Sequence, residues 1–465
     1  MKLHSAIIST LFIGILLYFG AVLGLFAQSA WLAAMSIFAI ISFAMSSQKK
    51  QLSTKNSLAL FQTTFLEKIL LTLLLLGSLS HAVQVFVPET GFDAVWYHLP
   101  VAVGVIQHNG LYYSPQLYQS VNPPFSDLFF TAGYFFAGEL GAKITAYFFY
   151  LAFICSFYAL SRVYISRTKA LALTLLVSLF QVVSWQAASF YIDVAKAFWE
   201  MSLLWMLVTS EPKMQKHKYY WIGLLLGASV ATKQFSLLLI PLILILVWMQ
   251  SKSIKKCVDV FVFAAAVVLP HFVFTFLYTG SLFVSTMLHI DKLQEIGGSA
   301  TIWAFASQKL MAIWQLPFAL FVARDYVFPP QAFVFIAAAL MCWKKNIRST
   351  SLTVHGVFSG YYYLLWWFIP PLSTRYALTG LSTSLIFVVV VFENQLSKYR
   401  RTVVSLFFLL IIGMFVPRLF VNARSLTFLL GFQDKKQYLQ QFLDTNIDTP
   451  LMRWHSDVFV TLKSE

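Results

Sequence analysis

The sequence predicts an all-α, polytopic membrane protein, and three observations support this prediction. Of the 465 residues, 59% are hydrophobic and 11% are charged, whereas soluble domains are about 25% charged. The mean hydropathy is +0.74. Apolar runs of roughly 20 residues, the length that crosses the hydrocarbon core of a bilayer as a helix, recur along the chain.

These runs predict about 13 transmembrane helices, in a range of 11–14. The first run follows only Lys2, and a second apolar run succeeds it at once without a clear cleavage site. We therefore interpret it as a membrane helix rather than a signal peptide. The expected helices cover approximately 5–26, 29–46, 66–87, 143–163, 170–185, 190–209, 219–233, 235–250, 257–279, 330–343, 352–369, 376–392 and 402–420.

The placement of basic residues predicts the orientation of these helices. With the N-terminus inside, the cytoplasmic linkers hold 20 Lys and Arg residues, and the outer loops before the C-terminal tail hold six. Cytoplasmic loops are enriched in Lys and Arg, so this asymmetry requires an odd number of spans and an external C-terminus. The net charge of +15 follows from these clusters and does not indicate nucleic acid. The six outer cations are Lys143, Lys233, Lys292, Lys309, Arg324 and Arg375.

Long loops gather on the predicted outer face, where loop-borne function is therefore expected. The outer segments are 88–142, with expected interfacial helices, 280–329 and 421–465. The run 302–322 is expected to lie in the interface or re-enter, because a full span would place the basic residues at 344–348 on the wrong side. We divide the chain into two extra N-terminal helices (1–46), a main transmembrane domain (66–420) and a small external tail (421–465).

The segment Pro88–Pro100 holds two acids and a histidine just beyond a predicted helix. Asp93 would lie near the lipid headgroups, where a carboxylate can take a proton from a hydroxyl. Alternatively, it caps the short helix that follows. Glu89 is expected to be a solvated loop acid. His98 either contacts substrate or a metal or is simply hydrogen-bonded, and Asp127 is expected to cap the next helix.

Three charged residues share one face of the predicted helix 190–209. Asp193, Lys196 and Glu200 are spaced i, i+3 and i+7, and such residues are neighbours on a helix surface. Charges within a span serve function or pair with one another. Asp193 is nearest the outer end, so it could line the same cavity as Asp93.

Two isolated cations lie against the general charge trend. Lys233 falls at the outer tip of a tight helical hairpin, and Arg375 begins a helix on the same side. One interpretation is snorkelling toward lipid headgroups. The other is a phosphate clamp, in which Arg offers a planar fork and Lys a point charge.

Four short motifs occur in a recognisable order across roughly residues 66–440. They are GFDAVWYHLP (91–100), YID (191–193), GLLLG leading to TK (223–233) and TRY (374–376). Together they resemble the GT-C superfamily of membrane glycosyltransferases, and bacterial proteins similar to protein O-mannosyltransferases and lipid A aminoarabinose transferases in particular. The tail segment GFQDKKQYL (431–439) also resembles such bacterial members.

Two features depart from the family pattern. Two apolar runs precede what is usually the first helix. Many members carry a second acid beside the first loop Asp, whereas position 94 here is Ala. A divalent metal is therefore possible but not indicated, no metal ligand is assigned, and no cofactor is certain.

The resemblance implies an inverting glycosyltransferase that moves a sugar from a polyprenyl-phosphate donor to an acceptor hydroxyl at the outer membrane face. Asp93 would be the catalytic general base. The acceptor would be a cell-envelope glycan, a lipid or a protein, and the enzyme would be a multi-pass protein of the bacterial inner membrane with its active site and C-terminus periplasmic. The substrate-binding residues implied are Tyr97, His98, Asn122, Asp193, Lys233, Arg375 and Tyr376.

Two other classes of membrane protein remain open at this point. A transporter or flippase for lipid-linked sugars would carry charges near the bilayer midplane, and Lys196 and Glu200 favour it. A polymerase or ligase of the O-antigen type also uses outer loops and arginines. The gathering of special residues at one face favours an enzyme.

The charge asymmetry generates a topology prediction. A reporter fused after residue 345 should read cytoplasmic, and one at the C-terminus should read external, because basic linkers stay on the cytoplasmic side. Alkaline phosphatase and green fluorescent protein fusions at both positions measure this. The opposite pattern would bring Asp93 inside and would contradict the whole site assignment.

Overall fold

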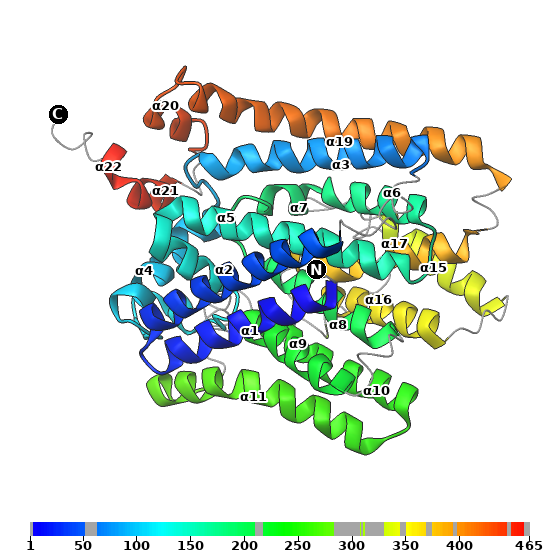
Figure 1. Ribbon diagram of the computed structural model, residues 1–465, viewed down its shortest axis with the longest axis horizontal. Coiled ribbons are helices and arrows are strands. Elements are labelled where there is room, and N and C mark those ends of the chain that lie inside the picture. The colour runs from blue at the N-terminus through cyan, green and yellow to red at the C-terminus, as the bar shows by residue number, and fades with distance from the viewer. Residues whose placement is uncertain are drawn as a thin grey trace.

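The computed structural model describes residues 3–51, 63–209, 217–282, 307, 310–311, 330–344, 350–368, 374–393, 398–443 and 448–459. Within these ranges the regular elements are helices and no strand is formed, so the predicted all-α class is confirmed. The helices pack as one bundle (Figure 1). The predicted loop 280–329 and the run 302–322 lie almost wholly outside the described residues.

The helices follow the chain in the order that the apolar runs predict. The short elements are η2 Gln84–Phe86, η3 Ala94–His98, η4 Tyr118–Val121, η6 Gln234–Leu238 and η8 Thr374–Ala377. The α-helices are α1 Leu3–Val22, α2 Phe26–Gln51, α3 Phe65–Val83, α4 Leu99–Gln107, α5 Asp127–Arg162, α6 Arg167–Ser178, α7 Gln181–Gln186, α8 Asp193–Val208, α9 Lys218–Thr232, α10 Leu239–Ser251, α11 Ile254–Thr279, α15 Pro330–Lys344, α16 Thr350–Phe368, α17 Leu378–Val391, α19 Arg400–Leu429, α20 Lys435–Gln440, α21 Asp448–Trp454 and α22 Ser456–Phe459.

Every expected transmembrane segment coincides with helix in this order. Among the described residues, six helices are long and apolar enough to cross a membrane by themselves. The span expected at 170–185 is divided at Leu179 and Phe180 into α6 and the short α7. The chain is therefore a multi-pass membrane protein, while the count of about 13 spans stays a prediction.

One helix boundary was predicted wrongly. Helix α5 begins at Asp127 and not near residue 143, so the outer segment 88–142 is more helical than expected. The helix is interrupted at Ala137 and Gly138, and Gly138 has φ +58° and ψ −146°. Glycine adopts such a conformation without the steric cost of a Cβ atom. The chain therefore turns there, and the first part of α5 stays with η3 and α4.

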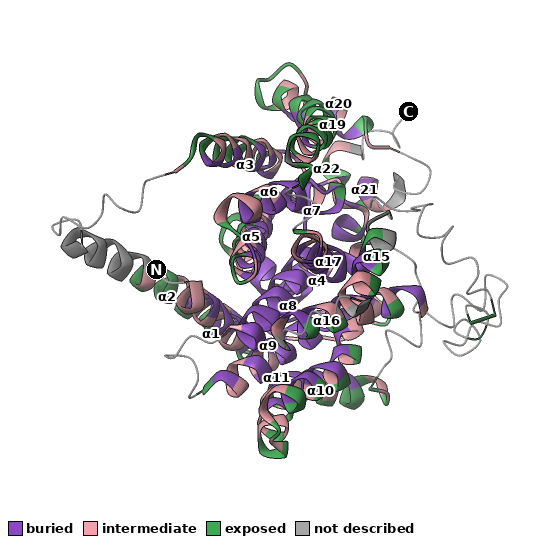
Figure 2. Ribbon diagram, turned by 90° about the vertical axis from the view of Figure 1, so that its right-hand side faces the viewer, coloured by how far each residue is buried: buried purple, intermediate pink, exposed green. Residues whose placement is uncertain are grey.

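Helix α8 forms the centre of the bundle. All of its residues are buried, and it packs against α5 and α9. Its sequence is apolar on all sides apart from its few charged residues, which is the pattern of a helix surrounded by protein. Figure 2 shows this buried centre enclosed by peripheral helices such as α3, α10 and α19, whose outer faces are exposed. Three charged residues are thus carried into the interior of the protein.

The N-terminal helix pair packs on the bundle through α1, which contacts α5, α9 and α11. The turn between α1 and α2 is held by the loop after α4. The backbone N–H of Phe26 donates to the Asn109 carbonyl at 3.0 Å, and the N–H of Ala27 donates to the Asn109 side chain at 2.7 Å. Asn109 has φ +52°, a conformation that Asn tolerates better than most residues.

The first outer segment and the C-terminal tail meet at one end of the bundle, where α4, α20, α21 and α22 gather (Figure 1). His455 Nε2 lies 2.9 Å from the carbonyl oxygen of Glu89. Trp454 donates to Glu139 at 3.0 Å. Glu89 is buried, not solvated as expected, because its carboxylate accepts hydrogen bonds from the backbone of Gly91 and Phe190 at 2.8 and 3.0 Å. Both segments therefore lie at the same end of the bundle, and the outward orientation of this end stays a prediction.

Candidate functional site

Four of the predicted site residues converge at this end of the bundle. Arg375 donates from Nη1 to Asp93 Oδ2 at 2.6 Å, and its Nε lies 3.9 Å from Asp193 Oδ2. Lys233 forms an ion pair with the other oxygen of Asp193. Two acids and two bases, far apart in the sequence, thus form a continuous chain that we call the charge quartet.

Each member of the quartet lies where a helix begins or ends. Asp93 precedes η3, and Asp193 is the first residue of α8. Lys233 joins α9 to η6 in extended conformation, and Arg375 lies in η8, which leads into α17. Ends of helices leave backbone groups and side chains free to face a common space.

Exposure separates the acids from the bases. The Asp193 side chain is 2% exposed and that of Asp93 is 12% exposed. Those of Lys233 and Arg375 are 18% and 22% exposed. The cations are therefore exposed enough to reach a ligand, while the buried Asp193 carboxylate pairs with both of them on the interior side.

Aromatic rings line the quartet. Lys233 Nζ lies 3.9 Å from the ring centre of Tyr376, and the Arg375 guanidinium lies 5.4 Å from the same ring and 5.7 Å from that of Tyr191. Burial and the nearby charge of Asp93 raise the pKa of Tyr97 well above its ordinary value. The Tyr97 phenol therefore stays protonated and can donate a hydrogen bond to a ligand.

Two further residues, which the sequence analysis did not select, complete the site. Tyr191 accepts the backbone N–H of Asp93 at 2.9 Å, which joins two of the recognised motifs. Gln186 donates to Asp193 at 3.0 Å and accepts from the backbone N–H of Val194 at 3.2 Å. Gln186 lies in a largely apolar run, 179–188, and its amide was the only signal that could have marked it.

The remaining predicted residues have different surroundings. Asp93 makes no side-chain capping hydrogen bond, so the cap interpretation is not realised. Asp127 does not cap α5; Ser126 holds that position, and Asp127 Oδ1 lies 2.7 Å from His98 Nδ1. His98 is buried and stacks on Phe190. Asn122 directly follows η4, and no hydrogen bond within the described ranges joins its side chain to the quartet.

A second charged cluster lies deeper in the bundle, centred on Glu200. Lys196 donates to Glu200 at 3.1 Å, and Ser229 and Ser236 donate to its other oxygen at 3.0 and 2.8 Å. The hydroxyls of Tyr362 and Thr379 donate to Oε2 of Glu200, the same oxygen that Lys196 contacts. The cluster therefore ties α8 to the corner that carries Lys233 and to the helix that follows Arg375.

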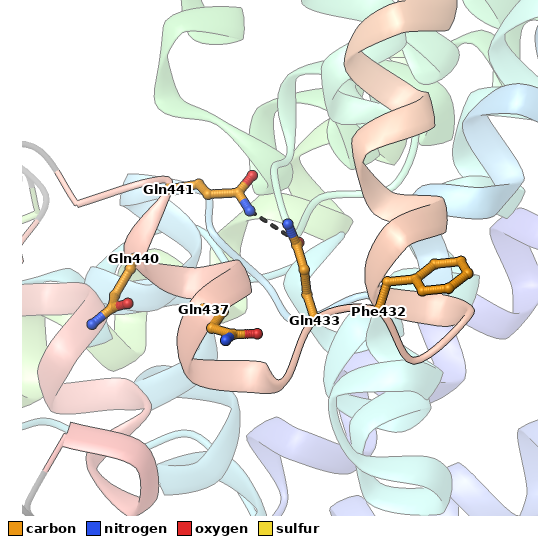
Figure 3. A pocket seen from close by; sticks show the side chains of 5 residues that line it. All are labelled: Phe432, Gln433, Gln437, Gln440 and Gln441. Atoms are coloured by element: carbon orange, nitrogen blue, oxygen red, sulfur yellow. Dashed lines mark hydrogen bonds between the residues drawn. The ribbon is translucent and has the colours of Figure 1, made fainter.

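The described residues contain no group of three His, Cys, Asp or Glu side chains that could hold a metal ion. An open hollow of about 510 Å³ lies beside α20 in the tail (Figure 3). Its polar lining is made of glutamine amides, and Gln441 donates to Gln433 at 2.9 Å. This hollow contains none of the predicted site residues.

The fold defines a class of protein, the polytopic helical membrane proteins, and comparison with solved structures narrows the fold further. Two crystal structures of ArnT from Cupriavidus metallidurans, one bound to undecaprenyl phosphate and one in the apo state, are similar to the chain. They match over 84% and 83% of this chain and 77% and 76% of theirs, with TM-scores of 0.52 and 0.51 and sequence identities of 12% and 13%.

The archaeal oligosaccharyltransferase AglB from Archaeoglobus fulgidus, in complex with an inhibitory peptide and a dolichol-phosphate, is also similar. It matches over 78% of this chain with a TM-score of 0.50 and 14% identity, and this chain spans 56% of AglB. No protein-family model matches the sequence. No curated protein matches it. ArnT and AglB are GT-C superfamily members, so the predicted GT-C fold is confirmed.

The Glu200 cluster generates a stability prediction. Glu200→Ala should lower the free energy of unfolding by about 3–5 kcal/mol, because it leaves Lys196 buried without its counter-charge. The double variant Lys196→Met/Glu200→Gln should lose less, since neither residual group is charged. Thermal unfolding of the purified protein in detergent measures both.

The control for this prediction is an exposed ion pair of the same chain. Lys169 and Glu393 pair at the surface, so Glu393→Ala should change stability by about 0–1 kcal/mol. Equal melting temperatures for Glu200→Ala and Glu393→Ala would show that the buried pair contributes no more than a surface pair.

Proposed function

We propose that this protein is an inverting glycosyltransferase that moves a sugar from a polyprenyl-phosphate donor to an acceptor hydroxyl at the outer face of the bacterial inner membrane. The observation that carries the proposal is the charge quartet, in which Asp93 and Asp193 meet Lys233 and Arg375. The GT-C fold supports it, because the similar solved structures hold undecaprenyl phosphate and dolichol-phosphate.

In this proposal Asp93 acts as the general base. Its carboxylate takes the proton from the acceptor hydroxyl as the acceptor oxygen forms a bond to C1 of the sugar. The bond between C1 and the phosphate oxygen breaks, and the lipid phosphate leaves with the electron pair. A single in-line displacement inverts the anomeric carbon. Arg375 fixes the position of this carboxylate, because its Nη1 donates to Asp93 Oδ2 at 2.6 Å.

Lys233 and Arg375 are placed to bind the phosphate and to stabilise the charge that develops on it. Each already contacts a carboxylate, so a phosphate must share these donors. Arg375 has five N–H donors in a planar fork, which allows it to keep Asp93 and to present another edge to the ligand. Buried Asp193 orients both cations, and the ring of Tyr376 supports Lys233 from one side.

The buried Lys196–Glu200 pair does not favour the transporter alternative. Transport needs charged or polar groups that line a changing path. Glu200 instead accepts hydrogen bonds from four hydroxyl groups in addition to Lys196. This pattern is that of a fixed structural network, which supports the proposed enzyme over a transporter.

Replacing the proposed base gives the most direct test of the chemistry. Asp93→Asn should reduce sugar transfer by about 10²–10⁴-fold, because an amide cannot accept the proton. Binding of polyprenyl phosphate should remain, since the Asn side-chain oxygen can still accept from Arg375. Transfer assays on purified protein measure this, with exposed Asp457→Asn from the tail as control. Near-normal transfer by Asp93→Asn would contradict the assignment.

Neutralising the clamp should affect donor binding even without acceptor. Lys233→Ala or Arg375→Ala should weaken binding of a polyprenyl phosphate by roughly 10- to 100-fold, because a hydrogen bond to a charged group contributes about 1.5–3 kcal/mol. Arg375→Lys keeps a positive charge, so its affinity for polyprenyl phosphate should lie between those of the wild-type protein and Arg375→Ala. Exposed Lys435→Ala, from the same end of the protein, is the control.

Equilibrium binding in detergent gives the affinities of these variants. Unchanged affinity in both Lys233→Ala and Arg375→Ala would refute the clamp and would assign these cations to lipid headgroups. Loss of binding in Asp93→Asn, equal to that of Arg375→Ala, would show instead that Asp93 acts in donor binding.

A further inference from the structure

Arg418, a cation outside the charge quartet, lies at the lipid-facing side of the bundle, and no acid of the described residues pairs with it. Arg418 belongs to α19, a helix of 30 residues whose apolar neighbours Val416, Leu419 and Phe420 are exposed. Its one hydrogen bond in the described structure runs from Nη2 to the carbonyl oxygen of Gln181 at 3.4 Å. That oxygen already accepts from Ser184 at 3.1 Å.

No acid of the described residues forms an ion pair with Arg418. In the seam between α3 and α19 beside it, the hydrogen-bonding side chains of the described residues are amides, hydroxyls and one imidazole, all uncharged groups or a histidine. Asn422, for example, donates to Ser80 at 2.8 Å and lies 3.3 Å from His81. His81 Nε2 is buried and has no partner in this part of the structure. The seam thus supplies hydrogen bonds but no counter-charge.

Arg418 lies toward the same side of the bilayer as the charge quartet. It follows Arg401 of the predicted cytoplasmic linker by 17 residues, which is about 26 Å of helix in a hydrocarbon core of about 30 Å. Helices α3 and α19 lie side by side at the periphery, with α6 and α7 beneath them (Figures 1 and 2). The guanidinium is therefore expected near the headgroups of the outer leaflet.

The short helix α7 connects Arg418 with the quartet. Its first residue, Gln181, accepts from Arg418, and its last, Gln186, donates to Asp193. The two ends of this helix are about 8 Å apart along its axis. Arg418 thus contacts the lipid-facing end of α7, and the other end of this helix contacts the quartet.

We propose that Arg418 binds the phosphate of a lipid lying against α3 and α19, at a position separate from the donor clamp. A guanidinium at the headgroup level without a protein counter-charge can take an anionic ligand there, and a lipid phosphate supplies that charge and several acceptor oxygens. Arginine suits this ligand because its planar fork binds two phosphate oxygens together. Basic pockets between membrane helices bind lipid headgroups in this way.

If the proposed function holds, this position is a lateral waiting site for a phosphate-bearing substrate or product lipid. The binding itself does not depend on that function. Two lipids carry the required chemistry, a phosphodiester of the bulk membrane and a polyprenyl phosphate monoester. They differ in charge and chain, so the experiment uses both.

The test measures retention of defined lipids by the purified, delipidated full-length protein, using native mass spectrometry. The lipids are phosphatidylglycerol, undecaprenyl phosphate and, without a phosphate, diacylglycerol. Arg418→Gln should lower retention of at least one phosphate lipid roughly tenfold, and Arg418→Lys should lower it less. Exposed Arg424→Gln on the same helix is the matched control and should leave retention unchanged.

The measurement is repeated in Lys233→Ala protein so that the proposed clamp does not obscure the result. Loss of undecaprenyl phosphate alone identifies the carrier lipid, and loss of phosphatidylglycerol as well identifies bulk lipid; both support the site. Unchanged retention in Arg418→Gln, or an equal loss of diacylglycerol, overturns it. An effect of Lys233→Ala without one of Arg418→Gln refutes this site only, whereas the reverse refutes the clamp.

Discussion

The cost of removing charge from water explains why the functional end of this protein has the form it has. A charged side chain among apolar helices must find an opposite charge or several hydrogen bonds. Asp193 begins the fully buried helix α8, so its carboxylate draws Lys233 and Arg375 toward the interior. Arg375 in turn reaches Asp93 in a segment a hundred residues away from α8. Pairing therefore assembles the site from four separate stretches of chain.

The deeper Glu200 cluster supports this assembly mechanically. It joins α8 to the serines on both sides of Lys233 and to Thr379, which follows Arg375 by one helical turn. Displacement of the backbone that carries either cation would strain these buried hydrogen bonds. On the opposite face, α7 connects Asp193 to the surface where Arg418 lies. The proposed sites of catalysis, donor binding and lipid access are thus connected through the packed helices α7 and α8.

The similarity to ArnT extends over most of both chains, yet only 12% of the aligned residues are identical. Membrane helices tolerate such divergence because any apolar residue satisfies a lipid-facing position, and helix order is kept by loop lengths and charge asymmetry. In this chain, helix ends carry all four members of the quartet.

The sequence by itself determined the helical class, the order of the membrane segments and four of the side chains that meet at the site. These properties can be read from short stretches of sequence. Hydropathy gives the length of each span, and an isolated cation on the side of the membrane where Lys and Arg are few stands out by its position. Tertiary structure alone decided the partners. Glu89 is buried by backbone donors brought from α7–α8, Asp127 meets His98 rather than capping a helix, and Gln186 and Tyr191 hold the two acids. No spacing rule predicts such contacts, because they join segments whose distance is set only when the helices pack.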